Sequence, residues 1–289
     1  MFIRSLPLSL CLVFLASAIP AEEPIYSIMP PSPPDKKVMA GNDPQIVAAC
    51  PVLEMQTVQQ HKGGIEIKSV GESKVATVDL NGNFYPSLSP GEPGYTVVED
   101  ALIQSAQALA RTIAALTDST ILYVSYPGDK GGSFAVAAPI NNALNAHKNN
   151  GGAVVSQISE TVAFTEAMSL ISISTAVIIN TNANATFHSA QTPLISGGFV
   201  NETTLRAQGS INRADELGAL NESFRAALIE KSGGNIDQEC AKAIIRDGIS
   251  VTLNPYQSLA LGLADIVIEN GAYTMRTGET LPSPLAALE

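Results

Sequence analysis

The sequence predicts an α/β domain in which strands and helices alternate and most strand pairs are parallel. Short apolar runs rich in β-branched residues, such as "TILYVSY" and "TAVIINT", are typical of strands buried on both faces. Longer segments between them carry apolar residues at helical spacing. Glycines follow several of these segments, as they do at helix C-termini. Repeated alternation of this kind favours helices layered on a mostly parallel sheet.

The first half of the domain supplies four predicted strands and two predicted helices. "KVATVDLNG" predicts a strand that ends in a turn, and "TILYVSY", "GAVVSQIS" and "TAVIINT" predict buried strands. Residues 133–152 predict a helix that ends at glycines and whose regularity is limited by Pro139. Residues 97–118 predict a helix with one apolar face, which consists of Leu102, Ala106, Leu109, Ile113 and Leu116.

The second half continues the alternation. In "NESFRAALIEKSGG", Asn221 is a candidate N-cap and a glycine pair ends the predicted helix. "IDQECAKAIIRDG" predicts another helix with a terminal glycine. "NPYQSLALGLADIVIE" begins with an N-cap residue and a proline at the first helical position, and it turns through Gly262 into a last strand.

Residues 1–21 have the pattern of a secretory signal peptide. Arg4 precedes a short apolar run, and the small residues of "ASA" end it. The run is too short to span a bilayer. We therefore expect a periplasmic or secreted protein that loses this segment by cleavage.

The rest of the chain divides into a Pro-rich N-terminal linker (22–61), an α/β domain (62–272) and a C-terminal tail (273–289). Export would leave Cys50 and Cys240 in an oxidising compartment, which permits a disulfide between them. Two unpaired cysteines are an equal alternative.

The composition narrows the classes of partner. The net charge is −11 and no basic stripe is available to neutralise phosphates, so a nucleic-acid partner is not expected. The same sign disfavours attraction to anionic lipid surfaces. The three histidines are far apart in sequence, and no Cys/His spacing suggests a metal site, so no metal or cofactor is expected.

Three places carry residues suited to chemistry. "YPGDKGG" is a glycine-rich turn whose N–H groups suit an oxyanion hole or a phosphate site, although its spacing is not that of a P-loop. An ordinary strand–helix turn is the simpler interpretation of this segment alone. "SETVAFTEA" turns from a strand into a helix near Thr165, whose hydroxyl suits either an N-cap or a nucleophile. His188, in "NANATFHSA", lies at the end of a predicted strand.

In order and spacing, these motifs resemble the Clp protease proteolytic subunit and its relatives in the ClpP/crotonase superfamily. The Ser-Pro-Gly-Gly turn of that family matches "YPGD", and its Gly-x-Ala-Ala-Ser motif matches "TVAFT". Its catalytic histidine matches His188, 23 residues after Thr165, and its Glu-Ala…Gly-Leu-x-Asp helix matches "SLALGLAD". The resemblance covers roughly residues 75–269 and implies a layered fold of repeated β-β-α units with mostly parallel strands.

The resemblance implies a serine-hydrolase mechanism acting on a peptide bond. Thr165 takes the nucleophile position and His188 that of the general base. The acid that orients the histidine falls near Asp247, whereas direct alignment from the last motif places Ser250 there. The implied oxyanion donors are backbone N–H groups, those of Gly128 or Asp129 and of Glu166.

The chain departs from the family pattern where reactivity is decided. Threonine adds a methyl group that restricts χ1, and an internal threonine lacks the terminal amine that activates known threonine nucleophiles. Thr161 and Phe164 replace small residues, and Asp129 brings negative charge towards a developing oxyanion. These departures favour a pseudo-enzyme that binds peptide or protein ligands or assembles with partners. The alternative is an active, ATP-independent periplasmic endopeptidase that uses Thr165 and His188.

Other branches of the superfamily fit less well. Crotonases act on acyl-CoA, but export and the lack of a basic cluster beside the glycine turn disfavour CoA. Signal peptide peptidase A relatives use a serine–lysine pair, for which Lys130 is only a weak match. By analogy we expect a homo-oligomer, and no ATPase partner outside the cytoplasm. Relatives extend an assembly helix over the region of residues 196–220, where the Gly and Asn content here disfavours a helix.

Overall fold

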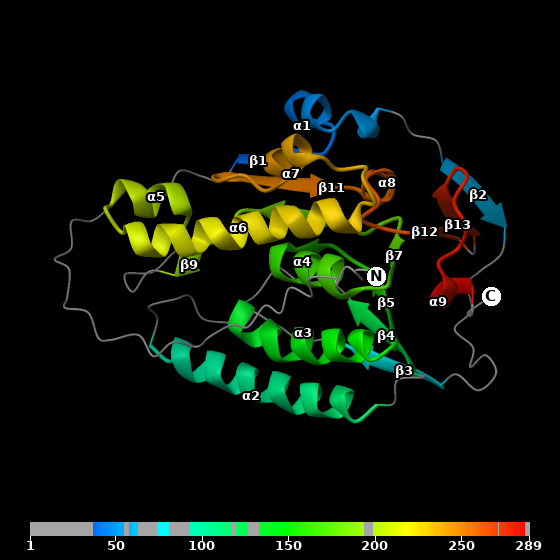
Figure 1. Cartoon of the computed structure of the whole chain (residues 1–289), viewed down its shortest axis with the longest axis horizontal. Coiled ribbons are helices and arrows are strands. Elements are labelled where there is room, and N and C mark those ends of the chain that lie inside the picture. The colour runs from blue at the N-terminus through cyan, green and yellow to red at the C-terminus, as the bar shows by residue number, and fades with distance from the viewer. Residues whose placement is uncertain are drawn as a thin grey trace, which may run out of the picture. The chain divides into compact units, whose positions relative to one another are not determined.

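A seven-stranded sheet organises the chain (Figure 1). The computed structural model describes residues 37–54, 58–62, 74–80, 93–116, 120–126, 133–193, 199–270 and 272–286, all within the unit Pro34–Glu289. The predicted signal peptide and the glycine turn with Gly128 and Asp129 lie outside the described residues.

The large sheet has the strand order β2-β13-β12-β7-β5-β4-β3. Neighbours from β3 to β12 pair in parallel, and β13 and β2 extend the sheet in antiparallel fashion. The predicted α/β class with mostly parallel pairing is thereby confirmed. The strands are β2 (Val58–Lys62), β3 (Lys74–Asp79), β4 (Thr120–Tyr126), β5 (Ala153–Ile158), β7 (Ala176–Asn180), β12 (Ile266–Glu269) and β13 (Ala272–Arg276).

A smaller sheet has the order β1-β11-β8-β6. Its outer pairs are parallel and its central pair, β11 with β8, is antiparallel. A separate antiparallel pair joins β9 (Thr192–Pro193) to β10 (Phe199–Val200). The strands of the smaller sheet are β1 (Lys37–Ala40), β6 (Val162–Ala163), β8 (Ala185–His188) and β11 (Ile249–Leu253).

The chain visits the two sheets in turn. From β5 it enters β6 of the small sheet and then helix α4 (Phe164–Ile173). From β7 it enters β8 and then passes to α5 (Glu202–Ala207) and α6 (Ile211–Lys231). Both passages run from a strand of the large sheet to a strand of the small sheet and then to a helix. Helix α7 (Gln238–Ile244), β11 and α8 (Pro255–Ala260) lead back to β12 of the large sheet.

Two further helices, α2 (Tyr95–Ala114) and α3 (Phe134–Asn149), lie side by side (Figure 1). The predicted apolar face of α2 is confirmed, because Ala106 and Ile113 are buried and its leucines pack against the core. Pro139 lies inside α3 as expected. Asn254 caps α8 in a capping box with Gln257, as the sequence pattern indicates.

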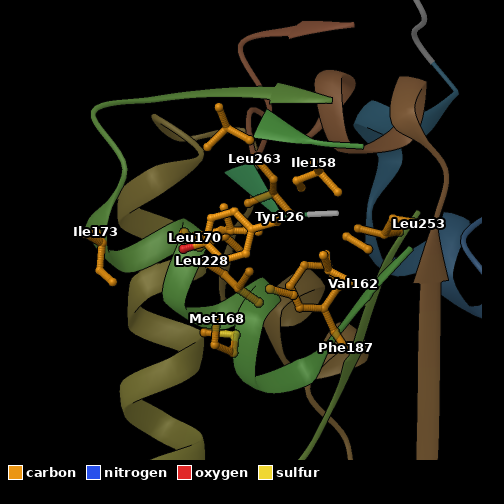
Figure 2. Packing of buried hydrophobic residues seen from close by; sticks show 14 of the residues in the cluster. Tyr126, Ile158, Val162, Met168, Leu170, Ile173, Phe187, Leu228, Leu253 and Leu263 are labelled. Carbon is orange, nitrogen blue, oxygen red and sulfur yellow. The ribbon is translucent and has the colours of Figure 1, made fainter. Parts of the chain in front are cut away.

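The main core lies where α4, α6 and the strands of both sheets meet. Phe187 of β8, Leu253 of β11 and Met168 of α4 belong to one core cluster, part of which Figure 2 shows. Leu228 brings α6 into the same cluster. This packing holds α4 and β8, which carry the predicted nucleophile and base, against one core.

Two predictions for the region after His188 are wrong. Within residues 196–220, whose Gly and Asn content disfavours a helix, α5 forms over Glu202–Ala207 and α6 begins at Ile211. The reason is position: Asn201 caps α5 by accepting a hydrogen bond from the Thr204 N–H, and Gly209, with a φ of +78°, lies between the two helices. Asn221 is not an N-cap, because it lies in the middle of α6.

Both predicted terminal extensions contain folded structure. In the predicted linker, residues 37–54 form β1, helix α1 (Pro44–Ala49) and the 3₁₀ turn η1 (Pro51–Leu53), and Met39, Ile46 and Leu53 are buried in the core. In the predicted tail, β13 pairs with β12, and α9 (Ser283–Ala286) buries Leu285. Their prolines and polar residues suggest extended chain, but pairing with distant strands supplies the missing hydrogen bonds.

The structure decides between the two cysteine alternatives. Cys50 and Cys240 form a disulfide with an S–S distance of 2.04 Å and a sequence separation of 190. The bond joins the end of α1 to α7. It therefore ties the N-terminal segment 37–54 to the body of the domain.

Candidate active site

The nucleophile position lies at the start of a helix that follows a short strand. Ala163 ends β6 and is the N-cap residue of α4, with extended backbone angles. Thr165 is therefore the second residue of α4, which excludes the N-cap alternative for it. The structure describes the backbone of residues 164–166 and not their side chains. N–H groups in the first helical turn are not used within the helix and favour negative charge nearby.

The pairing of β6 with β8 brings this helix start towards His188. The two strands are parallel, with Val162 opposite Ala185 and Ala163 opposite Thr186. Both pairs are offset by 23 residues, which is also the separation of Thr165 and His188. Paired strands lie about 4.8 Å apart, so the chain enters α4 alongside the end of β8. Helix α4 contacts β8 directly.

His188 projects from the side of β8 that faces away from the core. Phe187 is only 1% exposed, whereas the next side chain, that of His188, is half-buried on the opposite face. The Nδ1 atom of His188 lies 2.6 Å from the carbonyl oxygen of Ser189. A carbonyl only accepts hydrogen bonds, so Nδ1 carries the proton, and in the neutral form of the ring Nε2 is then the acceptor. A general base of the serine-hydrolase type needs this tautomer.

Ser250 is the residue directly opposite His188 in the antiparallel pair of β11 and β8. Opposed side chains in such a pair lie on the same face of the sheet. The next pair along this face, Thr186 and Thr252, joins its hydroxyls at 3.0 Å. The residue that faces the histidine across the sheet is thus a serine, as the direct alignment suggests.

The Asp247 carboxylate binds at the N-terminus of α5. Its Oδ2 accepts hydrogen bonds from the N–H of Thr203 at 2.9 Å and from the Thr203 hydroxyl at 2.7 Å. Gly248, with a φ of +73°, separates it from β11. The role of Asp247 as the acid that orients His188 stays a prediction.

Sequence reasoning missed one residue of this site, Asn221. Its Oδ1 accepts a hydrogen bond from the N–H of Ala190 at 2.7 Å, and the side chain is only 1% exposed. The signal for it is a polar residue on the buried face of α6, where Leu217 and Leu228 are its neighbours at helical spacing. A buried polar side chain of this kind needs a partner.

The start of α3 is fixed against α2 next to the undescribed glycine turn. The Ser133 hydroxyl donates to Glu99 Oε1 at 2.8 Å. Within the described parts of the chain, no group of three or more His, Cys, Asp or Glu residues is placed to hold a metal ion. Nor does any helix among those parts have the length and apolarity needed to cross a membrane.

No known family model matches this chain, and no curated protein is significantly similar to it in sequence. Among the solved structures that are similar to it are a peptidase from Plasmodium falciparum and a protein described as an enzyme. For each, the TM-score is 0.41 and the identity is 7%, over 67% of this chain and 95% of the other. Similarity of that degree leaves the chemistry of the site to be argued from its own geometry.

Proposed function

We propose that this chain is an exported, ClpP-like protein of the serine-peptidase fold that binds peptide at the Thr165–His188 site and hydrolyses it slowly or not at all. The observation that carries the proposal is the surroundings of His188. A serine faces it across the sheet, and a neutral carbonyl accepts from Nδ1. At Nδ1 this carbonyl oxygen takes the place that a carboxylate oxygen has in a triad, and it carries no full negative charge to stabilise an imidazolium there.

The expected loss of rate is large. A neutral group at the place of the triad carboxylate does not stabilise the imidazolium that forms when the histidine takes the proton. The methyl group of Thr165 further restricts the attacking hydroxyl. Peptide binding depends on neither feature, so it would outlast the loss of chemistry.

A second candidate is an active peptidase that uses Thr165 and His188. Two observations favour it. The pairing of β6 with β8 brings the start of α4 towards the end of β8, and a proton on Nδ1 of His188 leaves Nε2 to act as a base. The two candidates differ in turnover and not in the location of the site.

A gain-of-function test separates them. The mature, disulfide-bonded protein would be assayed with a fluorogenic peptide mixture, a fluorophosphonate label and direct peptide binding. Under our proposal wild type binds peptide with little turnover, Thr165→Ser raises labelling, and His188→Ala removes that gain. Ser172→Ala is the matched control, because it removes a hydroxyl from the same helix α4.

Rapid wild-type hydrolysis that Thr165→Ala abolishes would establish the second candidate. If wild type and Thr165→Ser neither bind peptide nor take up the label, both candidate functions are refuted.

The disulfide supports the proposed export, because such bonds persist in oxidising compartments. N-terminal sequencing of the exported protein would test cleavage near residue 21. A homo-oligomer is part of the proposal, and light scattering after gel filtration would measure its mass. Peptide or protein ligands are the proposed partners, without CoA or an ATPase.

A further inference from the structure

One peptide unit links His188 to α6. The carbonyl of Ser189 accepts from His188 Nδ1, and the N–H of Ala190 donates to Asn221 Oδ1 at 2.7 Å. That C=O and that N–H belong to the same planar peptide group, between Ser189 and Ala190. The orientation of one end therefore fixes the orientation of the other.

The peptide unit is deeply placed. Ser189, Ala190 and Asn221 are all buried, so water does not readily substitute for either hydrogen bond. Two hydrogen bonds at opposite ends of one amide also polarise each other, which strengthens both. Asn221 itself lies on a 21-residue helix whose neighbouring turns are anchored in the core by Leu217 and Leu228.

We propose that Asn221 is a positioning residue for His188. By holding the Ala190 N–H, it aims the Ser189 carbonyl at Nδ1 and so keeps the ring in the Nδ1–H tautomer with Nε2 as the acceptor. In this chain a backbone carbonyl and a helix amide together orient the base, as a carboxylate side chain does in a triad. The use of that base in peptide chemistry rests on the proposed function, whereas the tautomer does not.

Nuclear magnetic resonance of the ¹⁵N-labelled mature protein tests this directly. At a pH of about 8, where a histidine of ordinary pKa is neutral, long-range ¹H–¹⁵N spectra distinguish the protonated from the unprotonated ring nitrogen. The chain has three histidines, so His188→Gln assigns the signals. Wild type should show Nδ1 protonated and Nε2 unprotonated.

Three variants separate positioning from general stability. Asn221→Leu keeps the volume but removes the acceptor, and it should shift the His188 signals towards a mixture of tautomers. Asn221→Asp keeps an acceptor oxygen and should retain the wild-type pattern. Leu228→Ala opens a cavity under the same helix without touching the peptide unit, so it should leave the pattern unchanged.

An Nε2–H tautomer in wild type would overturn the proposal, as would an unchanged pattern in folded Asn221→Leu. If Asn221→Leu does not fold, hydrogen exchange of the Ala190 amide in wild type decides. Slow exchange of this amide that Leu228→Ala does not accelerate supports the positioning role of Asn221. Exchange as fast as in open loops refutes that role. A tautomer shift in a protein that binds no peptide would leave this inference intact and remove the proposed function.

Discussion

Removing the Cys50–Cys240 disulfide should destabilise the protein strongly. The bond closes a loop with a sequence separation of 190. Loop-closure entropy in the unfolded chain gives a stabilisation of about 5 kcal/mol for a loop of this size. Folded domains are stable by about 5–15 kcal/mol in total, so the bond accounts for a large share.

The double variant Cys50→Ala/Cys240→Ala is the perturbation of choice, because both side chains are buried and alanine leaves no unpaired polar group. Urea unfolding followed by circular dichroism would give the free energy of unfolding for the variant and for wild type. Hydrogen exchange would show where the loss falls. We expect the exchange rate to increase most in residues 37–54, which the bond anchors to α7, and less in β7 at the centre of the large sheet.

If the variant is less stable than wild type by under about 1 kcal/mol, the entropic argument is refuted. Two reactive thiols in the natively purified protein would refute the pairing itself. A uniform increase in exchange across the whole domain, without a larger effect in residues 37–54, would refute the anchoring role.

Three further perturbations test the packing. Ser258 is 3% exposed and lines an apolar pocket, and its buried hydroxyl has no hydrogen-bond partner among the described residues. Ser258→Ala should therefore raise the free energy of unfolding by about 1 kcal/mol, and a decrease measured by urea unfolding would contradict this. Asp265→Ala should lower the free energy of unfolding by about 2 kcal/mol, because the carboxylate accepts from the Val177 N–H at 2.7 Å and from Lys231 Nζ at 3.3 Å. Asp265→Asn should retain part of that stability, and equal losses in the two variants would argue against the ion pair. Burial raises the pKa of Tyr123 from 10.0 to about 12, so the folded state holds that proton more tightly than the unfolded state. The free energy of unfolding should therefore fall between pH 10 and pH 12, by up to about 3 kcal/mol. Tyr123→Phe should lose less stability over the same range, and identical pH profiles for the two proteins would contradict the shift.

Prediction from sequence succeeds where the interaction is local. The run from Thr120 to Tyr126 is a strand because most of its residues are β-branched or aromatic and favour that state, and both of its faces are buried. The apolar face of α2 and the cap at Asn254 depend on residues three or four positions apart. The residues and motifs of the candidate site also identify the strand-to-helix turn at Thr165 and the strand that ends at His188.

The tertiary structure decides everything that depends on which distant segments meet. Asn221 has the sequence context of a helix cap, but it is a buried acceptor for Ala190, 31 residues away. Likewise, only the register of β11 against β8 places Ser250 opposite His188. Cys50 meets Cys240 because β1 pairs with β11 and α1 packs against α7. The sequence thus determined the elements whose signals are local, and the candidate nucleophile and base. The surroundings of the base required the strand register, which is set by the packing of the whole core and not by neighbouring residues.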